Sequence, residues 1–332
     1  MNNQAGVVIG IDGGGSNSRA MVADRSGQAL GYAEAGPASI YRDDNAANNV
    51  QQAVRKALAE AGRTLADVRG IAAGIAGYDA PSDLEWVAQL TAMDGLDCPQ
   101  WHFNDTIAAH WGALLGKPGI IAISGTGSNI LAVTEQGRAI SNFDLQHYAA
   151  SAARFIAYDA VHEVLAGRAE EGEDCSLIAA MCGHWGAESL DRFREMAWGG
   201  WTEDRQLRDR QFGLFAPVVT EAAMQGGSLA RTVCGKAVEQ LTVGIEMLSA
   251  AFSASGVDVA LIGSVINSPY IRTKLSERLA GSRAKRFNVS QPHLSPAAGA
   301  VLYALFQLDG REQSERLISN LRASDLSAAH TL

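Results

Sequence analysis

An aspartate stands directly before three consecutive glycines near the start of the chain. Asp12 is followed by Gly13, Gly14 and Gly15, and the apolar run 7–9 before them is typical of a buried strand. Glycine has no Cβ and tolerates a positive φ, so such a loop can point several backbone N–H groups at one phosphate. A carboxylate there would repel a bare phosphate unless a divalent cation lay between the two. The stretch therefore predicts a nucleotide site with Mg²⁺ beside Asp12.

A second small-residue loop follows about 110 residues later and repeats the same order of elements. Residues 120–123 form an apolar run, residues 124–129 read Ser-Gly-Thr-Gly-Ser-Asn, and residues 130–134 predict a returning strand. Turns at residues 24–27 and 135–138 close the two copies. Glycines alone would also suit a plain hairpin turn. The recurrence instead favours two phosphate loops in two domains, which grip one polyphosphate from opposite sides of an interdomain cleft.

The elements around the first loop exclude two common nucleotide folds. In a P-loop or a dinucleotide fold the glycine loop opens into a helix, whereas here residues 18–22 predict a second strand. The Gly-x-Gly-x-x-Gly pattern is also missing. The order of elements, from strand to loop, strand, turn and strand, instead predicts an antiparallel meander.

The remaining pattern predicts an α/β chain whose second half is mostly helical. Asp105 follows a short strand and precedes a helix, so it would also suit a helix N-cap. We expect strands at residues 6–11, 18–22, 30–35, 68–73, 101–103, 120–123, 130–134 and 257–262. We expect helices at residues 45–61, 83–93, 106–115, 149–166, 177–183, 189–198, 212–225, 228–256, 270–279 and 295–308, and a frayed tail after Leu326.

Composition limits the class of protein. The 332 residues are enough for two domains, and 47% of them are hydrophobic, so disorder is not expected. A net charge of −9 argues against broad capture of nucleic acid. No apolar run is long enough to span a bilayer, and the first residues lack a secretory signal, so a cytoplasmic location is expected. The four cysteines have no metal-binding spacing, which predicts buried or idle thiols.

Six motifs in order resemble the N-acetylglucosamine kinase-like branch of the BadF/BadG/BcrA/BcrD-type ATPase family. This family belongs to the superfamily of sugar kinases, heat-shock chaperones and actin. The resemblance covers about 300 residues, more than a single domain of ordinary size. The motifs are residues 10–15, 74–77, 104–109, 125–129, 263–265 and 296–300.

The resemblance implies two actin-like (ribonuclease H-like) lobes, each a five-stranded mixed sheet with flanking helices, and ATP in the cleft between them. Residues 1–118 would form the N-terminal lobe and residues 119–332 the C-terminal lobe, with the last helix, at about residues 295–308, packing back on the first lobe. The implied activity is that of an ATP-dependent kinase that phosphorylates a hydroxyl of an amino sugar such as N-acetylglucosamine or glucosamine. A homodimer is a family-level expectation.

The resemblance also implies roles for individual residues. Asp105 matches the catalytic carboxylate, and Asp12 would hold Mg²⁺ through water. The sugar would contact Ser39, Gly77, Asn104, Asn129 and Asp144. The nucleotide would contact Gly13, Gly14, Gly15, Ser16, Gly125, Thr126, Gly127 and Ser128 through its phosphates, and Gly263 and Ser264 through its adenosine.

One segment departs from the family pattern. Kinases of this branch carry a Gly-Asp-Glu-Gly sugar loop after the second phosphate loop, and here Tyr148, Ala149, Ala150 and Ser151 stand there. A lost charge-assisted hydrogen bond costs about 1.5–3 kcal/mol of ligand affinity. The chain could use Asp144, Gln146 or His147 for another amino sugar or polyol, could have lost phosphotransfer and become a nucleotide sensor, or could leave this task to other residues.

A second alternative comes from the same family. Some members are ATP-driven activators of dehydratases or reductases and hold an iron–sulfur cluster with cysteines shared across a dimer. The four cysteines here do not stand at the places that this role requires. Because Asp105 and both phosphate loops are present, the sequence favours the kinase.

Overall fold

The structure, a computed structural model, describes residues 6–169, 172–310 and 314–325. The chain divides into two compact units, and each is described by itself. The first unit contains the described residues up to Lys117 and those from Pro292 onward, and the second contains Pro118–Gln291. The stretch from Pro292 onward, which contains the helix expected at about residues 295–308, packs with the first unit. The tail expected after Leu326 lies outside the described residues.

The first unit is built on a five-stranded mixed sheet in the order β3-β2-β1-β4-β5. The first three strands form the predicted antiparallel meander, and β4 and β5 run parallel to β1. The strands are β1 (Val7–Gly13), β2 (Ser18–Asp24), β3 (Ala29–Ala35), β4 (Val68–Ile75) and β5 (Gln100–Asn104).

The second unit repeats this sheet strand for strand, in the order β8-β7-β6-β9-β10. Again three strands form an antiparallel meander and two run parallel to its first strand. The predicted duplication and the predicted fold class are confirmed. The strands are β6 (Gly119–Ser124), β7 (Ser128–Val133), β8 (Ala139–Ser141), β9 (Gly256–Ile262) and β10 (Arg286–Ser290); the sequence analysis missed β8 and β10, which are short and partly exposed.

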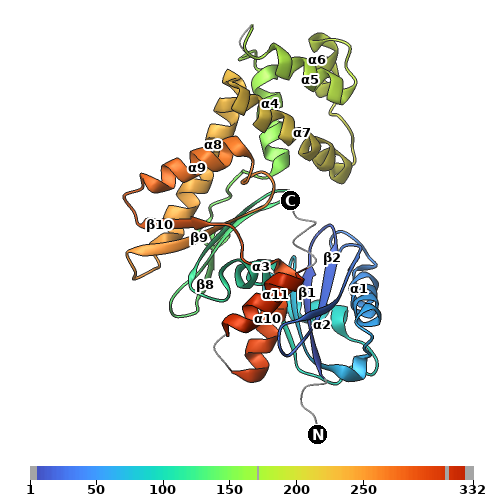
Figure 1. The fold of residues 1–332 in the computed structure, drawn as a ribbon. Coiled ribbons are helices and arrows are strands. Elements are labelled where there is room, and N and C mark those ends of the chain that lie inside the picture. The colour runs from blue at the N-terminus through green and yellow to red at the C-terminus, as the bar shows by residue number, and fades with distance from the viewer. Residues whose placement is uncertain (1–5, 170–171, 311–313, 326–332) are drawn as a thin grey trace. The chain divides into compact units, whose positions relative to one another are not determined.

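Helices cover both faces of the first sheet (Figure 1). Alternation along β1 sends Val7, Ile9 and Ile11 toward α1, and sends Val8 and Gly10 toward α10, as side chains alternate along any strand. Asp12 shares the α10 face by the same alternation. The helices are α1 (Ala46–Glu60), α2 (Leu84–Thr91), α3 (Asp105–Leu114), α10 (Pro296–Asp309) and α11 (Glu315–Ser324), with short 3₁₀ turns at Leu65–Asp67 and Pro81–Asp83.

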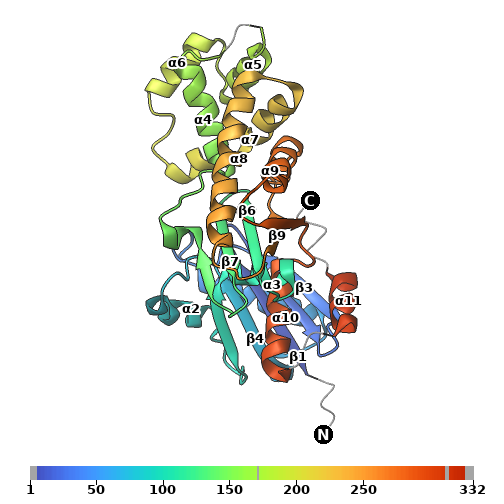
Figure 2. The ribbon, with the colours of Figure 1, turned by 90° about the vertical axis from the view of Figure 1, so that its left-hand side faces the viewer.

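Glycines let α10 approach both β1 and α3 closely. A Cβ on Gly10 would lie 2.3 Å from the Ala297 carbonyl oxygen, and one on Gly299 would lie 2.2 Å from the Gly112 nitrogen. Figures 1 and 2 show the red helix α10 against the blue strands from the other end of the chain. The motif at residues 296–300 therefore packs helix on sheet and so holds β1 and α3 in place.

We expect Gly299→Ala to destabilise the chain, because the added Cβ would meet backbone atoms that cannot move aside. Overpacking of this kind costs about 3 kcal/mol of unfolding free energy. Gly235→Ala is the matched control, since a Cβ there meets nothing within 4 Å and helix α8 (Ser228–Ser249) gains helix propensity. Thermal unfolding should show a lower midpoint for the first variant and an equal or higher midpoint for the second. Equal midpoints in both variants would contradict the packing described here.

The second unit carries its helices as a layer on the sheet and a bundle beyond it, with the long helix α8 contacting β6 and β7 (Figure 2). The helices are α4 (Ala153–Leu165), α5 (Cys175–Trp185), α6 (Leu190–Trp198), α7 (Arg205–Gln225), α8 (Ser228–Ser249) and α9 (Pro269–Ala280), with a 3₁₀ turn at Asn142–Leu145. No helix among the described residues is long and apolar enough to cross a membrane.

Three predicted helix boundaries in this unit are wrong. The sequence analysis also missed one helix of the first unit, α11. The helix expected from residue 149 begins at Ala153, because residues 149–152 bind the second phosphate loop instead. The helix expected from residue 212 begins at Arg205, where the Asp204 side chain caps it. The helix expected to reach residue 256 ends at Ser249, because Glu135 accepts hydrogen bonds from the Ser253 and Ala254 amides.

Candidate functional site

A row of three charged residues crosses the first sheet at the end of β1. Asp12 lies opposite Arg19 on β2, and Arg19 lies opposite Glu34 on β3. Side chains directly opposite on neighbouring strands are close enough to pair. The Arg19 guanidinium lies 3.1 Å from an Asp12 carboxylate oxygen and 3.3 Å from a Glu34 oxygen. The sequence analysis missed Arg19, because it ended the first strand at residue 11, whereas β1 continues to Gly13 and brings Asp12 opposite Arg19.

Burial dominates the electrostatics of Asp12. Its side chain is almost fully buried, which raises its pKa, while the neighbouring Arg19 charge acts in the opposite direction. Glu34 is different, since the hydrogen bond from the Tyr32 hydroxyl, at 2.6 Å, lowers its pKa. Asp12 therefore needs a positive partner to remain charged, and Arg19 supplies part of that charge.

The glycines after Asp12 do not adopt the positive φ that the sequence analysis invoked for them. No side chain fits at Gly13, because a Cβ there would lie 2.6 Å from Ile75 and 2.8 Å from Ala38. Gly15 has open space around it, and Ser16 is exposed. The loop is closed by a hydrogen bond from the Gly14 amide to the Asn17 carbonyl. Its tip is thus bare backbone open to a ligand.

Asp105 opens helix α3 close to the charged row. The N-cap of this helix is Asn104, whose side-chain oxygen accepts from the Thr106 amide at 3.0 Å. The suggestion that Asp105 itself is the N-cap is therefore wrong. Gly74 lies opposite Asp12 on β4, and a Cβ on it would be 3.2 Å from the Asp105 Cα. This glycine lets the first turn of α3 approach the sheet beside Asp12.

The side chain of Asn104 is already engaged inside the protein. Its amide nitrogen donates to the Tyr78 carbonyl at 3.2 Å and to an Asp79 carboxylate oxygen at 2.9 Å. Its oxygen accepts from both the amide and the hydroxyl of Thr106. Asn104 thus ties the loop after β4 to the start of α3.

The environment of Asp105 favours its protonated form. Asp105 is partly buried, and this desolvation raises its pKa to about 7, with the negative charges of Asp12 and Asp79 adding to the increase. A carboxylate with such a pKa can accept a proton near neutral pH far better than an ordinary one. This is the electrostatic signature expected for a general base.

We expect the pH dependence of kcat/KM to report this group. The base form is lost as the pH falls through about 7, so kcat/KM should drop tenfold per pH unit below it. Asp79→Asn keeps the hydrogen bond from Asn104 but removes a negative charge, so it should move this limb to lower pH. Asp94→Asn, an exposed carboxylate that does not act on Asp105, is the control. A wild-type limb near pH 4, or one that Asp79→Asn leaves in place, would contradict this account.

Ser39 and Gly77 lie together on the same unit, with an aromatic side chain beside them. Gly77 has a φ of +88°, and a Cβ on it would be 3.4 Å from the Tyr41 ring and 3.9 Å from the Ser39 hydroxyl. The Tyr41 ring is 69% exposed and meets Trp86 edge-on. The sequence analysis missed Tyr41, although it stands only two residues after Ser39.

The loop at residues 124–129, which was predicted to bind phosphate, is supported by the loop after β9. The Ser124 carbonyl accepts hydrogen bonds from the Val265 and Ile266 amides, both at 3.1 Å. Gly263 has a φ of +105°, and a Cβ on it would lie 2.4 Å from that same carbonyl. Thr126 and Gly127 are exposed at the tip of the loop after β6, and Ser264, in the loop after β9, is also exposed. Two of the loops predicted to bind nucleotide are therefore neighbours in this unit.

The segment at residues 148–151, which departs from the pattern of the resembled family, is part of this support. The Ser128 hydroxyl donates to the Ala149 carbonyl at 2.7 Å, and the Ser124 hydroxyl donates to the Ser151 carbonyl at 2.6 Å. The Ala149 and Ser151 side chains are buried. Residues 149–151 therefore fix the loop through their backbone, which needs no acidic side chain.

Arg154, in the first turn of α4, brings a positive charge to the second loop. Its guanidinium donates to the Thr126 carbonyl at 3.3 Å and lies 3.7 Å from a carboxylate oxygen of Asp209. The Tyr158 hydroxyl donates to the same Asp209 side chain. The sequence analysis missed Arg154, because only the tertiary packing of α4 and α7 places it there.

Asn129 and Asp144 both accept hydrogen bonds from Ser141. The Asn129 oxygen accepts from the Ser141 hydroxyl at 3.2 Å, and an Asp144 oxygen accepts from the Ser141 amide at 2.8 Å. Asp144 is exposed and caps the 3₁₀ turn in which it stands.

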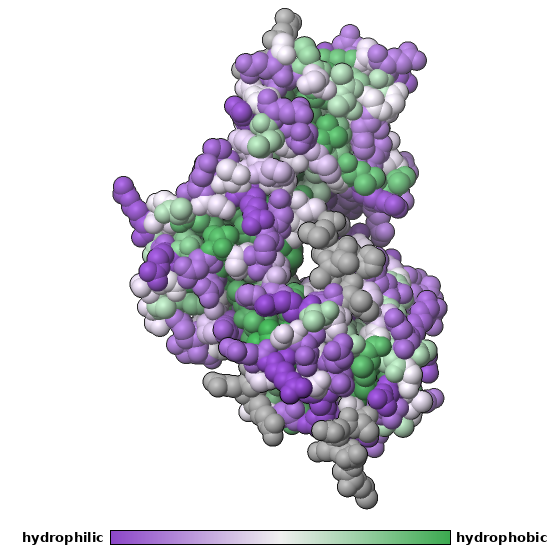
Figure 3. All heavy atoms as spheres, viewed as in Figure 1, coloured by the Kyte–Doolittle hydropathy of each residue, from purple (hydrophilic) through white to green (hydrophobic). Residues whose placement is uncertain are grey.

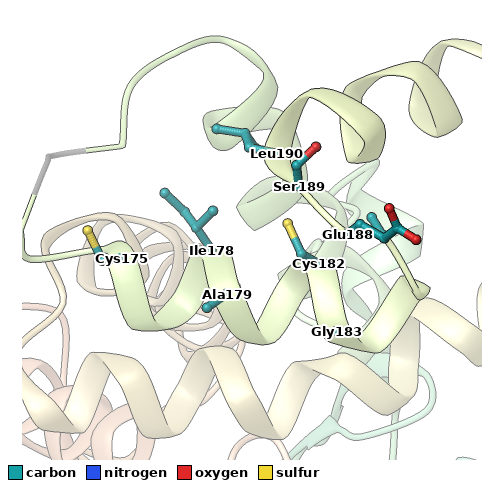
Figure 4. Close-up of a pocket in the computed structure, with 9 residues that line it drawn as sticks. Cys175, Ile178, Ala179, Cys182, Gly183, Glu188, Ser189 and Leu190 are labelled. Carbon is teal, nitrogen blue, oxygen red and sulfur yellow. The ribbon is translucent and has the colours of Figure 1, made fainter.

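A hollow of about 470 Å³ lies in the helical part of the second unit, against α5 and the start of α6 (Figure 4). Cys175 and Cys182 line the same side of α5, opposite Ser189 and Leu190. None of its lining residues was predicted to bind a ligand. Cys175 is exposed and Cys98 half-buried, so only Cys182 and Cys234 are the buried thiols that composition suggested.

Within the described part of the chain, no three His, Cys, Asp or Glu side chains gather as a metal site. Mg²⁺ does not need such a set, because it usually binds through one or two carboxylates, water and phosphate oxygens. Asp12 fits this requirement, since it is a buried carboxylate that needs a positive partner at the base of a phosphate loop.

Comparison with known proteins shows where the chain belongs. The model of the BadF/BadG/BcrA/BcrD ATPase family matches residues 9–304. The glucosamine kinase GspK of Vibrio cholerae is 25% identical over 260 residues, which are 77% of this chain and 84% of the relative. The N-acetyl-D-glucosamine kinase of Dictyostelium discoideum is 23% identical over 325 residues, which are 90% of this chain and 98% of the relative.

The fold is also shared with solved structures. A crystal structure from Chromobacterium violaceum, of a protein itself proposed to be an N-acetylglucosamine kinase, superposes with a TM-score of 0.67 at 22% identity. The match covers 89% of this chain and 98% of that one. Together with the duplicated sheets, this likeness establishes the fold.

Proposed function

Because the chain belongs to the BadF/BadG/BcrA/BcrD ATPase family, we propose that it is an ATP-dependent kinase that phosphorylates a hydroxyl of an amino sugar. Glucosamine and N-acetylglucosamine are the substrates named for the two relatives, each aligned over more than three quarters of the present chain. The observation that carries the proposal is Asp105, a carboxylate at the start of α3 whose pKa is raised to about 7 beside Asp12. A base at that position can take the proton of an attacking sugar hydroxyl or of water, and the sugar kinases among the relatives favour the hydroxyl.

Asp105 is the general base of the proposed reaction. The sugar hydroxyl donates its hydrogen bond to the Asp105 carboxylate while its oxygen attacks the γ-phosphorus of ATP. The bond from the γ-phosphorus to the β–γ bridging oxygen breaks, ADP leaves, and the hydroxyl proton passes to Asp105. Asn104 and Gly74 position this carboxylate, Asn104 by capping the helix and Gly74 by admitting it to the sheet.

Asp12 is the proposed anchor for Mg²⁺. A bound Mg²⁺ would neutralise charge on the phosphates during transfer. Asp12 would hold it through water, and Arg19 would keep the buried carboxylate charged and oriented. Arg19 is thus a positioning residue whose guanidinium spans Asp12 and Glu34.

The loops bind the remaining groups of the substrates. Phosphate oxygens accept hydrogen bonds from the backbone amides of the first loop, at Gly13, Gly14, Gly15 and Ser16, and bind the second loop at residues 125–128. Adenosine binds Gly263 and Ser264. Arg154 adds a positive charge beside Thr126, which suits a phosphate oxygen.

The sugar has its own set of residues. Ser39 and Gly77 bind it together with Tyr41, whose exposed ring supplies an apolar wall. Asn129 and Asp144 are the candidates from the second unit. Asn104 acts by holding Asp79 and the start of α3 in place, because its own hydrogen-bonding groups are engaged.

The altered segment at residues 148–151 is compatible with this activity. Its backbone supports the second phosphate loop, so phosphate binding does not depend on the missing acids. Their loss would change which amino sugar binds rather than abolish transfer. The expected homodimer and the cytoplasmic location remain predictions.

The test is a substrate panel. The purified chain is incubated with ATP, Mg²⁺ and single amino sugars, sugars or cyclitols, and ADP release and phosphorylated product are both measured. We expect ADP release that depends on an amino sugar and equals the product formed. Hydrolysis of ATP without any sugar, or tight ATP binding without turnover, would instead favour an activator or a nucleotide sensor.

A further inference from the structure

Helix α7 of the second unit is apolar on two opposite sides. Its inner side buries Phe212, Phe215, Ala216, Val219 and Ala223 against the other helices of the unit. A surface helix of a globular protein normally turns a polar face to the solvent, and one that is apolar all round is normally buried. The outer side of α7 therefore requires an explanation.

The outer side carries a row of exposed residues that is mostly apolar and includes one Arg and one Glu. Leu207, Leu214 and Met224 are 55%, 64% and 55% exposed, and Val218 is 37% exposed. Figure 3 shows apolar atoms gathered over α7 on the face in view. Single exposed apolar residues are ordinary, but several along one helix face mark an interaction surface. We call the row Leu207, Arg210, Leu214, Pro217, Glu221 and Met224 the α7 stripe; all six residues are exposed.

The spacing of the α7 stripe is that of a helix-pairing seam. Its members follow one another at intervals of 3, 4, 3, 4 and 3 residues, the alternation that places residues along one line of a paired helix. The stripe covers 17 residue steps, or about 26 Å of helix. It is thus long enough to pack against a second helix of equal length.

The α7 stripe is complementary to itself when two copies run antiparallel. Positions equally far from the midpoint between Phe215 and Ala216 then face each other. This pairs Leu207 with Met224, Leu214 with Pro217, and Arg210 with Glu221, each twice by symmetry. A parallel arrangement would instead place Arg210 against Arg210 and Glu221 against Glu221.

We propose that two copies of this chain associate through the α7 stripe, antiparallel about a two-fold axis at its centre. The apolar pairs exclude water, and the two Arg210–Glu221 pairs select the antiparallel register. Among the described residues neither Arg210 nor Glu221 makes an ion pair within the chain, and Glu221 accepts a hydrogen bond from the Gln225 side chain at 2.9 Å. Both charges are exposed and can pair with a partner copy. The proposal does not depend on the kinase activity.

Charge reversal tests the register directly. Sedimentation of the full-length chain should show a dimer at micromolar concentrations. Arg210→Glu and Glu221→Arg should each raise the dissociation constant about 100-fold, because each creates two like-charged contacts. Mixing the two single variants should restore dimers, since every Glu then faces an Arg. The double variant Arg210→Glu/Glu221→Arg should also dimerise like the wild type.

Two further variants separate this surface from others. Leu214→Glu should give monomers, whereas Trp198→Glu, which alters a residue 78% exposed on α6, should leave the dimer intact. Far-UV circular dichroism and the thermal unfolding midpoint, measured on every variant, show whether the chains are folded. A monomeric wild type, a dimer that ignores charge reversal, or variants that do not complement each other on mixing would overturn the proposal.

Discussion

Asp105→Asn should reduce kcat for sugar phosphorylation about 1,000-fold and leave ATP binding nearly unchanged. Asparagine has the same shape and still fits at the start of α3, where Asn104 provides the N-cap. It cannot accept a proton from the attacking hydroxyl. We expect steady-state ADP release to fall while the dissociation constant for ATP, measured by calorimetry, stays within a few-fold of the wild-type value.

The control for this variant is Asp79→Asn, which removes a charge from the same neighbourhood but keeps the proposed base. It should retain most of the turnover at a pH well above the limb. If Asp105→Asn turned over sugar like the wild type, or if both variants lost activity equally, Asp105 would not be the base.

The same substitution should stabilise the folded chain at alkaline pH. The pKa of Asp105 is raised from 3.8 to about 7 by folding, so the folded state holds this proton more tightly than the unfolded state. Its contribution to stability is therefore greatest at low pH and is lost as the pH rises through about 7. Asparagine does not titrate, so the difference in unfolding midpoint between variant and wild type should grow as the pH is raised from about 4 to about 7 and stay constant above that. A difference that shrinks would contradict the environment described for Asp105.

Asp12→Asn should reduce turnover about 100-fold or more by weakening the use of Mg²⁺. The amide keeps a hydrogen-bond acceptor for Arg19 but has no charge with which to hold a hydrated cation. Arg19 would then retain only Glu34 as its anionic partner. We expect the Mg²⁺ concentration needed for half-maximal rate to rise and the unfolding midpoint to remain near the wild-type value.

Glu34→Gln is the matched control for this second variant. It removes the other carboxylate from Arg19 but leaves the pair with Asp12 in place. Its Mg²⁺ dependence should follow that of the wild type. An unchanged Mg²⁺ dependence in Asp12→Asn would contradict the proposal that Asp12 holds Mg²⁺.

The sequence predicted the two phosphate loops because their signals are local. Each loop has glycines, a preceding apolar strand and a returning strand within about twenty residues, and such patterns are read from neighbouring positions alone. The same locality gave the meander, but the expected strand ended at residue 11, so the pairing of Asp12 with Arg19 was not predicted. Asp204 was likewise a visible N-cap signal for the true start of α7, which the prediction overlooked.

Other parts of the site depend on tertiary contacts. Arg154 lies beside Thr126 only because α4 packs on α7 and brings Asp209 within reach of the guanidinium. The pKa of Asp105 depends on its burial and on charges 26 and 93 residues away in the chain, at Asp79 and Asp12. Residues 149–151 support the loop through backbone carbonyls. Every residue type has such a carbonyl, so the sequence gives no signal for this role.

The most direct test of the central claim is a single-turnover measurement with excess enzyme and ATP labelled in its γ-phosphate. The wild type should transfer the label to the amino sugar in one rapid phase. Asp105→Asn, saturated with Mg²⁺ and ATP to the same degree, should form labelled sugar about 1,000-fold more slowly. Transfer at the wild-type rate by Asp105→Asn would contradict the assignment of this carboxylate as the group that accepts the hydroxyl proton.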